Sequence, residues 1–231
     1  MNKKDFVRDM FDAIAPRYDL LNRILSAGID QRWRKRAIRL LSKDKPSKIL
    51  DVATGTADMA IIAATLGPTE IVGVDIAKEM IEVGRYKIRK KGLSDIIRLK
   101  VCDAEQLPFS DNEFDAALVA FGVRNFTDLE LGLREISRVV CPGAPLIVLE
   151  FSRPTHFPIK QLYGFYGSFI LPYVGKLISG DDAAYTYLPD SIKKFPDGKD
   201  FLDALSRSRF EQVTQERLTF GIASLYSGVA S

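Results

Sequence analysis

The chain has 231 residues, of which 46% are hydrophobic and 27% are charged, and its formal net charge at pH 7 is +3. This length suffices for one α/β domain with its own core, and the composition excludes a disordered or low-complexity protein. A net charge this small does not by itself indicate a polyanionic partner. Cys102 and Cys141 are far apart and in apolar surroundings, so neither a disulfide framework nor a metal site is expected.

The N-terminal segment is charged throughout and lacks the uninterrupted apolar core of a signal peptide. The most apolar stretch is interrupted by Pro172 and Lys176, so it is too short to span a bilayer. We therefore expect a cytoplasmic protein that can touch a membrane but does not cross one. Positive charge clusters at 32–39 and 85–91, where it forms either solvated helix faces or a surface for phosphates and lipid headgroups.

Five short runs rich in Val, Ile and Leu predict β-strands, and stretches with helical spacing separate them. The predicted strands are 48–53, 70–75, 96–102, 114–120 and 145–151. The predicted helices are at about 57–66, 77–91 and 128–140. The segments "FEQVTQER" and "LTFGIASLY" predict a final strand pair. This alternation is typical of a doubly wound, mostly parallel sheet with helices on both faces, whose ligands bind at the carboxyl ends of the strands.

Acidic residues and glycines stand at these strand ends. They are Asp51 and Gly55 after the first strand, Asp75 after the second, Asp103 after the third, and Phe121 and Gly122 after the fourth. Gly55 and Asp75 together resemble a degraded dinucleotide fingerprint, so a nicotinamide cofactor is one alternative. However, Asp51 would repel a pyrophosphate and attract an ammonium group. The carboxylates suit a ligand with an amine, a ribose and an adenine and without phosphate, which is S-adenosylmethionine.

Each strand end then has its own task. Gly55 lets the backbone approach the cofactor, Asp75 accepts hydrogen bonds from both ribose hydroxyls, and Asp103 with Ala104 contacts the edge of the adenine. Any one of these aspartates could instead only cap a helix or close a turn. Three of them on successive strands, together with the glycine loop, favour a methyltransferase core.

The chain also resembles a known family in six motifs. They are "YDLLNRILSAGIDQRW" (18–33), "DVATGTADMA", "DAEQLPFSDNEFD", "FGVRNFTD" (121–128), "RVVCPGAPLIVLEFSRP" and "YLPDSIKKFPD". Together they are similar to the ubiquinone/menaquinone biosynthesis C-methyltransferase family over about 11–228. The resemblance implies a class I, Rossmann-like S-adenosylmethionine-dependent methyltransferase fold with a seven-stranded sheet. It also implies C-methylation of the ring of a polyprenylated quinol precursor, either demethylmenaquinol or the benzoquinol of the ubiquinone pathway.

By this likeness Thr56, Asp75, Asp103 and Ala104 fall on cofactor positions of the family. The expected cofactor set is Asp51, Thr54, Gly55, Thr56, Asp75, Ile76, Asp103, Ala104 and Phe121. The chain departs from the family at Ala120, where some relatives have a serine in the cofactor site. It also has Asp30 in place of a histidine that is frequent in the first motif, which argues against a required imidazole there.

Carbon methylation of a quinol requires an electron-rich, reduced ring and a group that accepts a proton or stabilises a phenolate. Arg124 and Asn125 follow the fourth strand and are the candidates to hold the phenolate and orient the ring. Arg124 could instead pair with a carboxylate such as Asp128. Tyr18 is either part of a lid or a packing residue, and Asp58 is either a base or a first-turn helix carboxylate.

We expect one domain, 1–231, made of four parts. They are a helical lid at 1–45, a cofactor-binding core at 46–152, an aromatic-rich substrate cover at 153–200 and a C-terminal strand pair at 201–231. The cover is expected to form a groove for a lipid tail, or else an ordinary helical layer packed on the core or a homodimer interface. Asn22, Phe169 and Tyr185 are the expected substrate contacts. His156, the one histidine, is expected at the surface rather than in catalysis.

Two further function classes stay open from the sequence. One is a methyltransferase acting on RNA or protein, which would dock through the basic runs in a salt-dependent way. The other is a noncatalytic cofactor-binding scaffold, because a fold alone does not establish activity. No nucleic-acid-binding module is recognisable, so nucleic acid is not an expected partner.

Overall fold

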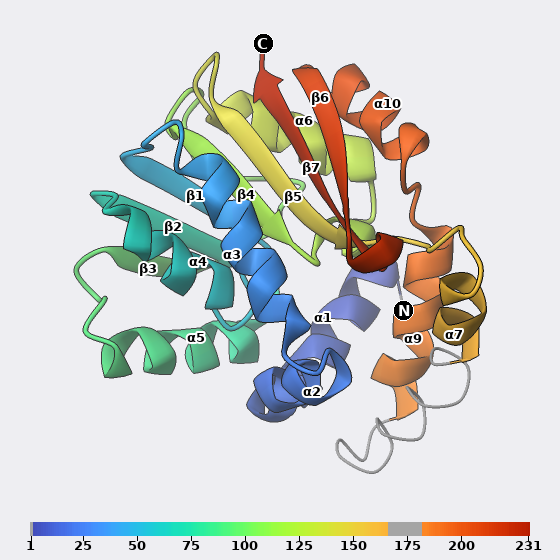
Figure 1. The fold of residues 1–231 in the computed structure, drawn as a ribbon. Coiled ribbons are helices and arrows are strands. Elements are labelled where there is room, and N and C mark those ends of the chain that lie inside the picture. The colour runs from blue at the N-terminus through green and yellow to red at the C-terminus, as the bar shows by residue number, and fades with distance from the viewer. Residues whose placement is uncertain (1, 166–181) are drawn as a thin grey trace.

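The computed structural model describes residues 2–165 and 182–231. Seven strands form one sheet in the order β3-β2-β1-β4-β5-β7-β6 (Figure 1). The strands are β1 (Lys48–Val52), β2 (Glu70–Asp75), β3 (Ile97–Val101), β4 (Ala116–Ala120), β5 (Pro145–Phe151), β6 (Phe210–Leu218) and β7 (Ala223–Ala230). Pairing is parallel from β3 to β5, and β7 is antiparallel to both of its neighbours. The predicted mostly parallel, doubly wound sheet is confirmed.

Helices cover both faces of this sheet (Figure 1). One face carries α3 (Ile29–Leu41), α4 (Asp58–Ala63) and α5 (Lys78–Lys90), and the other carries α6 (Leu129–Val139) and α10 (Lys199–Arg207). The central strands β1 and β4 are buried on both sides, which is why they read as continuous apolar runs in the sequence. The three helices predicted between the strands are therefore present, with ends within two or three residues of those expected.

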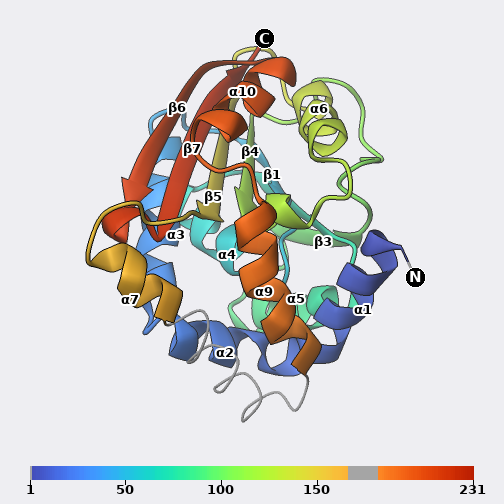
Figure 2. The ribbon, with the colours of Figure 1, turned by 90° about the vertical axis from the view of Figure 1, so that its right-hand side faces the viewer.

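Four more helices lie together beyond the carboxyl ends of the parallel strands (Figure 2). They are α1 (Lys3–Ile14), α2 (Tyr18–Leu25), α7 (Ile159–Phe165) and α9 (Asp182–Lys194). Helix α1 begins at Lys3, and the side chain of Asn2 just before it caps the helix by accepting a hydrogen bond from the backbone N–H of Asp5. Its apolar side packs in one cluster with Leu21 of α2 and Met80 of α5. The N-terminal helices thus cover the edge at which the strand-end residues lie.

The last strand begins later than the sequence predicted. The segment "LTFGIASLY" was expected to be extended from Leu218, but Thr219–Gly221 form a 3₁₀ turn and β7 starts at Ala223. Thr219 and Phe220 have φ values of 46° and 58°. This left-handed conformation is incompatible with an extended strand, so the prediction was wrong over the first residues of the segment.

Candidate active site

The loop after β1 is anchored by Asp51, which is almost completely buried. One carboxylate oxygen accepts hydrogen bonds from Thr54 Oγ1 (2.6 Å) and from the backbone N–H of Ala60 (3.0 Å). The other oxygen, Oδ1, is buried and has no hydrogen-bond partner within the described part of the chain. Burial raises the pKa of Asp51 to about 7, although the hydrogen bond from Thr54 opposes this shift. A buried acceptor without a donor fits a ligand that brings one, such as an ammonium group.

The same loop contains three left-handed residues: Ala53, Gly55 and Ala57 have φ values of 52°, 56° and 65°. A Cβ added to Gly55 would meet nothing nearer than a ring carbon of Tyr18 at 4.0 Å, so backbone conformation, rather than space, is the visible reason for glycine. At Gly122, after β4, an added Cβ would come within 2.4 Å of the Cβ of Ala53. The ends of β1 and β4 therefore approach each other closely. Non-glycine residues in the left-handed conformation, such as Ala53 and Ala57, are strained, and strain of this kind is concentrated at functional sites.

Asp75 at the end of β2 is held rigidly by backbone donors. Its two carboxylate oxygens accept from the N–H groups of Gly55 (2.8 Å) and Ala77 (2.9 Å). Burial raises the pKa of Asp75 to about 6, while the backbone hydrogen bonds oppose the shift. Each carboxylate oxygen can accept a second hydrogen bond, so a fixed Asp75 fits a ribose with two neighbouring hydroxyls.

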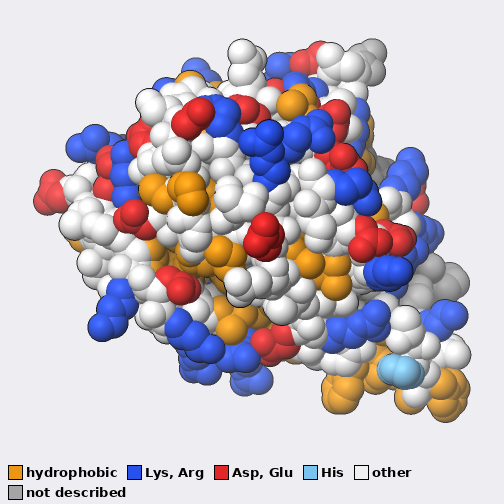
Figure 3. Space-filling model, turned by 90° about the horizontal axis from the view of Figure 1, so that it is seen from above, with side chains coloured by type: hydrophobic (Ala, Val, Ile, Leu, Met, Phe, Trp, Pro, Cys, Tyr) orange, Lys and Arg blue, Asp and Glu red, His pale blue; other side chains and the backbone are white. Residues whose placement is uncertain are grey.

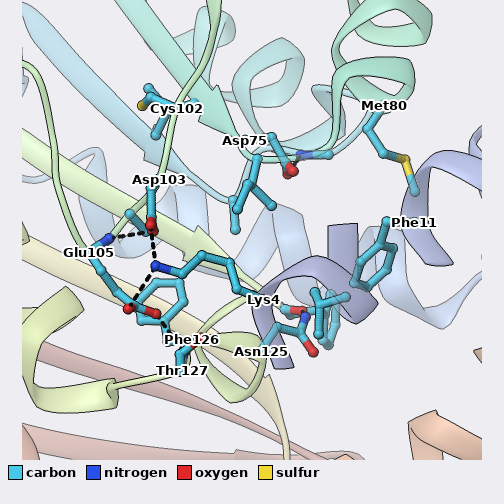
Figure 4. A pocket seen from close by; sticks show the side chains of 18 of the residues that line it. Lys4, Phe11, Asp75, Met80, Cys102, Asp103, Glu105, Asn125, Phe126 and Thr127 are labelled. Carbon is cyan, nitrogen blue, oxygen red and sulfur yellow. Dashed lines mark hydrogen bonds and ion pairs between the residues drawn. The ribbon is translucent and has the colours of Figure 1, made fainter. Parts of the chain in front are cut away.

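Helix α1 reaches across to the end of β3. The ammonium group of Lys4 contacts Asp103 and lies 3.2 Å from Glu105 Oε2 (Figure 4). Beside it, Lys3 Nζ donates to the backbone carbonyl of Phe126. The sequence did not mark Lys4, because its partners are about a hundred residues away in the chain.

These groups enclose a first cavity of about 80 Å³. Six of the nine expected cofactor residues line it: Gly55, Asp75, Ile76, Asp103, Ala104 and Phe121. Asp51 and Thr54 are buried and hydrogen-bonded to each other, and they do not line this cavity. Thr56 Oγ1 donates to Asp19 Oδ1 (2.6 Å) of α2. Lys4 and Phe11 of α1 also line the cavity and narrow it. The cavity is accordingly smaller than pockets for drug-sized ligands, which commonly measure about 300–1,000 Å³.

A second cavity of about 540 Å³ adjoins the first. Its walls come from α1, α2, α3, α7 and α9 and from the ends of β4 and β5, and most of its surface is apolar. Phe11, Tyr18 and Phe121 line both cavities. A ligand in the first cavity and a ligand in the second would thus face each other across these three rings.

Arg124 lines the second cavity and is neutralised by a carboxylate that sequence reasoning missed. Its Nη1 lies 2.7 Å from Glu150 Oε1, and the two side chains are only 5% and 0% exposed. Burial raises the pKa of Glu150, and the charge of Arg124 opposes this. The alternative that Arg124 pairs with a carboxylate is therefore confirmed, but its example, Asp128, was wrong, because Asp128 caps α6 by accepting from the N–H of Leu131. An acidic residue within the apolar strand "PLIVLEF" was the available signal.

Tyr18 lines both cavities, and Asn125 lines the first. The hydroxyl of Tyr187 donates to Asn125 Oδ1 (3.1 Å), which orients the amide. Burial raises the pKa of Tyr18, while its hydrogen bond with Asn22 and the charges of Arg34 and Arg124 lower it. The positive charges of Arg34 and Arg124 therefore both favour the ionised form of the Tyr18 hydroxyl.

The expected substrate residues have three different outcomes. Asn22 lines the second cavity. Phe169 lies outside the described residues, and the side chain of Tyr185 in α9 is also outside them. Tyr187, two residues further along α9, lines the cavity and was not singled out by the sequence.

Asp58 lines neither cavity. It forms ion pairs with Lys87 (2.6 Å) and Arg23 (3.1 Å). Burial raises its pKa, but the charges of Lys87, Arg34 and Arg23 outweigh this and leave the pKa below its ordinary value. A carboxylate with a lowered pKa is a poor general base, so this geometry favours the helix-end role for Asp58.

No group of three potential metal ligands occurs among residues 2–165 and 182–231. The site has fixed carboxylates at the ends of β1, β2 and β3 and an apolar cavity beside them, within a sheet whose seventh strand is inserted antiparallel. The buried free oxygen of Asp51 and the anchored Asp75 fit the amine and the ribose of S-adenosylmethionine. These features define a class I S-adenosylmethionine-dependent methyltransferase.

Comparison with known proteins gives the family. The chain belongs to the ubiE/COQ5 methyltransferase family, whose model matches residues 1–230. It is 49% identical to the demethylmenaquinone methyltransferase of Bacteroides fragilis over 97% of this chain and 92% of that protein. It is 42% identical to the ubiquinone/menaquinone biosynthesis C-methyltransferase UbiE of Geotalea daltonii, over 98% of this chain and 97% of that protein.

Solved structures support the fold. The [4+2]-cyclase SpnF superposes with a TM-score of 0.69 at 17% identity, covering 100% of this chain and 97% of that chain. An S-adenosylmethionine-dependent methyltransferase of Thermotoga maritima, described as a possible histamine N-methyltransferase, has a TM-score of 0.66 at 17% identity, covering 97% and 99%. Since one of these proteins is named a cyclase, structural likeness at such identity shows the fold alone.

Proposed function

We propose that this enzyme transfers a methyl group to a ring carbon of a polyprenylated quinol, with demethylmenaquinol as the substrate and the benzoquinol of the ubiquinone pathway as the alternative ring. The observation that carries this proposal is the apolar second cavity, which meets the cofactor cavity at Phe11, Tyr18 and Phe121. A flat aromatic ring placed there has its tail among apolar side chains and its reacting edge toward the methyl donor.

S-adenosylmethionine, when bound, supplies a methyl group on a positively charged sulfur. Asp51 holds its amine, Asp75 its ribose, and Asp103 with Ala104 its adenine edge. The buried carboxylates favour this cation because few other positive charges share the cavity, which is lined mainly by apolar atoms. The ring carbon would exchange one hydrogen for the methyl group, so one proton would be released to water.

The chain must also make the ring nucleophilic. A phenolate is more nucleophilic than a phenol, and buried cations or hydrogen-bond donors at its oxygen stabilise it. Tyr18 lines both cavities, Asn125 the first and Arg124 the second, and these three side chains orient the ring. Glu150 keeps Arg124 in place through their 2.7 Å ion pair.

The N-terminal helices act as a lid over both cavities. In the described conformation Lys4 is bound to Asp103 and Glu105, at the position proposed for the adenine. The cofactor enters when α1 withdraws Lys4, and the apolar side chains of α1 and α2 then close over the quinol.

Exposed apolar side chains, here called the apolar rim, lie on α2, in and before α7 and in the turn before β7, which are elements that also contribute to the lining of the second cavity. They are Leu20 and Ile24 of α2, Phe157, Leu162 and Phe165 in and before α7, and Phe220 in the turn before β7. Figure 3 shows hydrophobic side chains gathered at the corner of the molecule around α7, whereas charged and apolar groups alternate over the rest of that face. Among the described residues no helix is long and apolar enough to cross a bilayer. This apolar rim rests on the membrane surface and receives the lipid-tailed quinol from it.

The tail-binding part of the proposal is tested with Leu162→Asp. Leu162 lines the cavity yet is 62% exposed, so a charge there spares the core. We expect kcat/KM for a tetraprenyl quinol to fall about tenfold or more, because a carboxylate opposes burial of the tail. The control is Leu131→Asp, which places the same charge on α6, away from both cavities. Equal losses of kcat/KM with long-tailed and short-tailed quinols would remove the tail-binding role. Binding to lipid vesicles would identify the exposed apolar surface as a membrane face, whereas a dimer in sedimentation would identify it as a homodimer face.

The proposed reaction is tested by incubating the protein with S-adenosylmethionine and short-tailed demethylmenaquinone or its benzoquinone counterpart, with and without a reductant. Mass spectrometry should show one added methyl on a ring carbon only under reducing conditions. Cofactor binding without transfer to either ring would contradict the proposal. RNA and protein acceptors would then be the next substrates to test.

A further inference from the structure

Arg34 of α3 is a buried cation that the proposed reaction has not yet used. Its residue is only 6% exposed and lines the apolar second cavity. Its Nε is buried without a hydrogen-bond acceptor anywhere in the described residues. The nearest acidic oxygen, Asp30 Oδ2, is 3.6 Å away, which is too long for a good hydrogen bond. A buried guanidinium in this state is costly unless it serves a ligand.

Asp30 lies close enough to offset part of the positive charge of Arg34, yet it leaves the Nε–H of Arg34 without an acceptor. Its carboxylate accepts hydrogen bonds from Ser26 Oγ (2.9 Å), Gln31 Nε2 (2.9 Å) and Arg23 Nη1 (3.2 Å). The negative charge of Asp30 is therefore shared by two arginines, and its oxygens are occupied by other donors. Arg124 differs, because Glu150 neutralises it at 2.7 Å. Arg124 Nε is also buried without a hydrogen-bond partner among the described residues, so the two arginines differ in charge pairing rather than in free donors. Of these two cavity arginines, Arg34 is the one whose positive charge has no carboxylate within hydrogen-bonding distance, so it is the one with binding capacity for an anion.

The position of Arg34 matches the reacting end of the cavity. Its guanidinium carbon lies 5.3 Å from the centroid of the Phe121 ring, and Phe121 lines both cavities. The Phe121 ring in turn packs against Phe151 with centroids 4.6 Å apart, so the guanidinium rests on an aromatic wall. Burial raises the pKa values of Tyr18 and Asp51, and the charge of Arg34 opposes both shifts, in keeping with a position near the junction with the first cavity.

We propose that Arg34 binds the phenolate oxygen of the quinol next to the carbon that is methylated, an inference that rests on the proposed function. A planar guanidinium on an aromatic face suits an oxyanion carried by a flat ring. The hydroxyl proton leaves to water as the phenolate forms. After the methyl group is added, the ring carbon releases its own proton and the oxygen regains one, so the quinol is restored. Arg124, paired with Glu150, then acts as a positioning residue.

The test uses 2-farnesyl-1-naphthol, whose ionisation is followed by the change in its ultraviolet absorption. It is titrated between pH 7 and 11 in the complex of the whole protein with S-adenosylhomocysteine. We expect the wild-type protein to lower the naphthol pKa by about one unit or more relative to detergent micelles, since an adjacent opposite charge has effects of this size. Arg34→Gln should abolish the lowering, and Arg34→Lys should keep part of it. Lys35→Gln, an exposed neighbour on the same helix, should leave it unchanged.

Two results would overturn this role of Arg34. One is a pKa lowering that survives in Arg34→Gln but disappears in Arg124→Gln. The other is a wild-type protein that binds the naphthol and its methyl ether equally tightly at pH 9, a comparison that needs no variant and so holds even if Arg34→Gln fails to fold. Turnover of the quinol is measured separately. A lowered naphthol pKa without turnover would contradict the proposed function and leave the anion site standing.

Discussion

The two cavities that meet at Tyr18 and Phe121 have walls of different origin. The cofactor cavity is built mainly from residues at the ends of β1 to β4, and backbone N–H groups hold its carboxylates. The second cavity is built mainly from helices that precede β1 or follow β5, and its lining contains apolar side chains and the buried Arg34 and Arg124. The strand ends thus supply polar groups that the backbone holds in place, while the helices supply a mostly apolar wall. Substitutions in the two walls should accordingly affect different ligands.

The largest expected effect is on the cofactor side. Asp75→Ala should weaken binding of S-adenosylhomocysteine about a hundredfold or more, because two hydrogen bonds to a charged group are lost, each contributing about 1.5–3 kcal/mol. Titration calorimetry measures this affinity. Asp95→Ala removes a carboxylate from an exposed turn and serves as the matched control. An affinity within twofold of the wild type would contradict the assignment of Asp75 to the ribose.

On the substrate side, the expected effect is on stability. Glu150→Ala leaves Arg124 buried without its partner, so the free energy of unfolding should fall by about 3–5 kcal/mol. Urea unfolding measures the change. The double variant Glu150→Met with Arg124→Met removes both charges and should recover most of the stability. If the double variant were no more stable than Glu150→Ala, the ion pair would not be what holds this wall together.

These two walls also differ in what the sequence could predict. The positions of Asp51, Asp75 and Asp103 at one edge of the sheet were predictable, because strand ends can be located from local apolar runs and parallel strands end at one edge. Glu150 was missed because its partner, Arg124, comes from the end of another strand. Lys4 and Arg34 were missed because helix packing, which the sequence pattern does not specify, brings them to the site. Local periodicity therefore predicts the cofactor wall but not the enclosure.

A smaller effect is the pH dependence of the free energy of unfolding that the buried carboxylate of Asp51, at the end of β1, causes. The pKa of Asp51 is about 7 in the folded protein and about 3.9 when unfolded, so the folded state retains a proton that the unfolded state releases. The stabilisation is fully present below pH 4 and is lost as the pH rises through 7. Relative to Asp51→Asn, the cofactor-free wild type should therefore be more stable at pH 5 than at pH 8. A difference between the two proteins that does not vary with pH, measured by urea unfolding, would contradict this.

The smallest expected effect concerns the contact between lid and core. Lys4→Ala removes the ion pairs to Asp103 and Glu105, which are partly exposed and so contribute about 0.2–1 kcal/mol. The association rate of S-adenosylmethionine should rise by about two- to fivefold, because α1 then opens more readily. Stopped-flow fluorescence measures this rate, with Lys35→Ala as the control. A slower association in Lys4→Ala would mean that Lys4 assists binding of the cofactor rather than obstructing it.

The most direct test of the two-cavity arrangement is a crystal structure with both S-adenosylhomocysteine and a short-tailed quinol bound under reducing conditions. We expect the ribose on Asp75, the ring between Tyr18 and Phe121 with an oxygen at Arg34, and the unsubstituted ring carbon facing the sulfur. A quinol ring bound outside this junction, with its carbon turned away from the sulfur, would contradict the proposed division between a cofactor wall and a substrate enclosure.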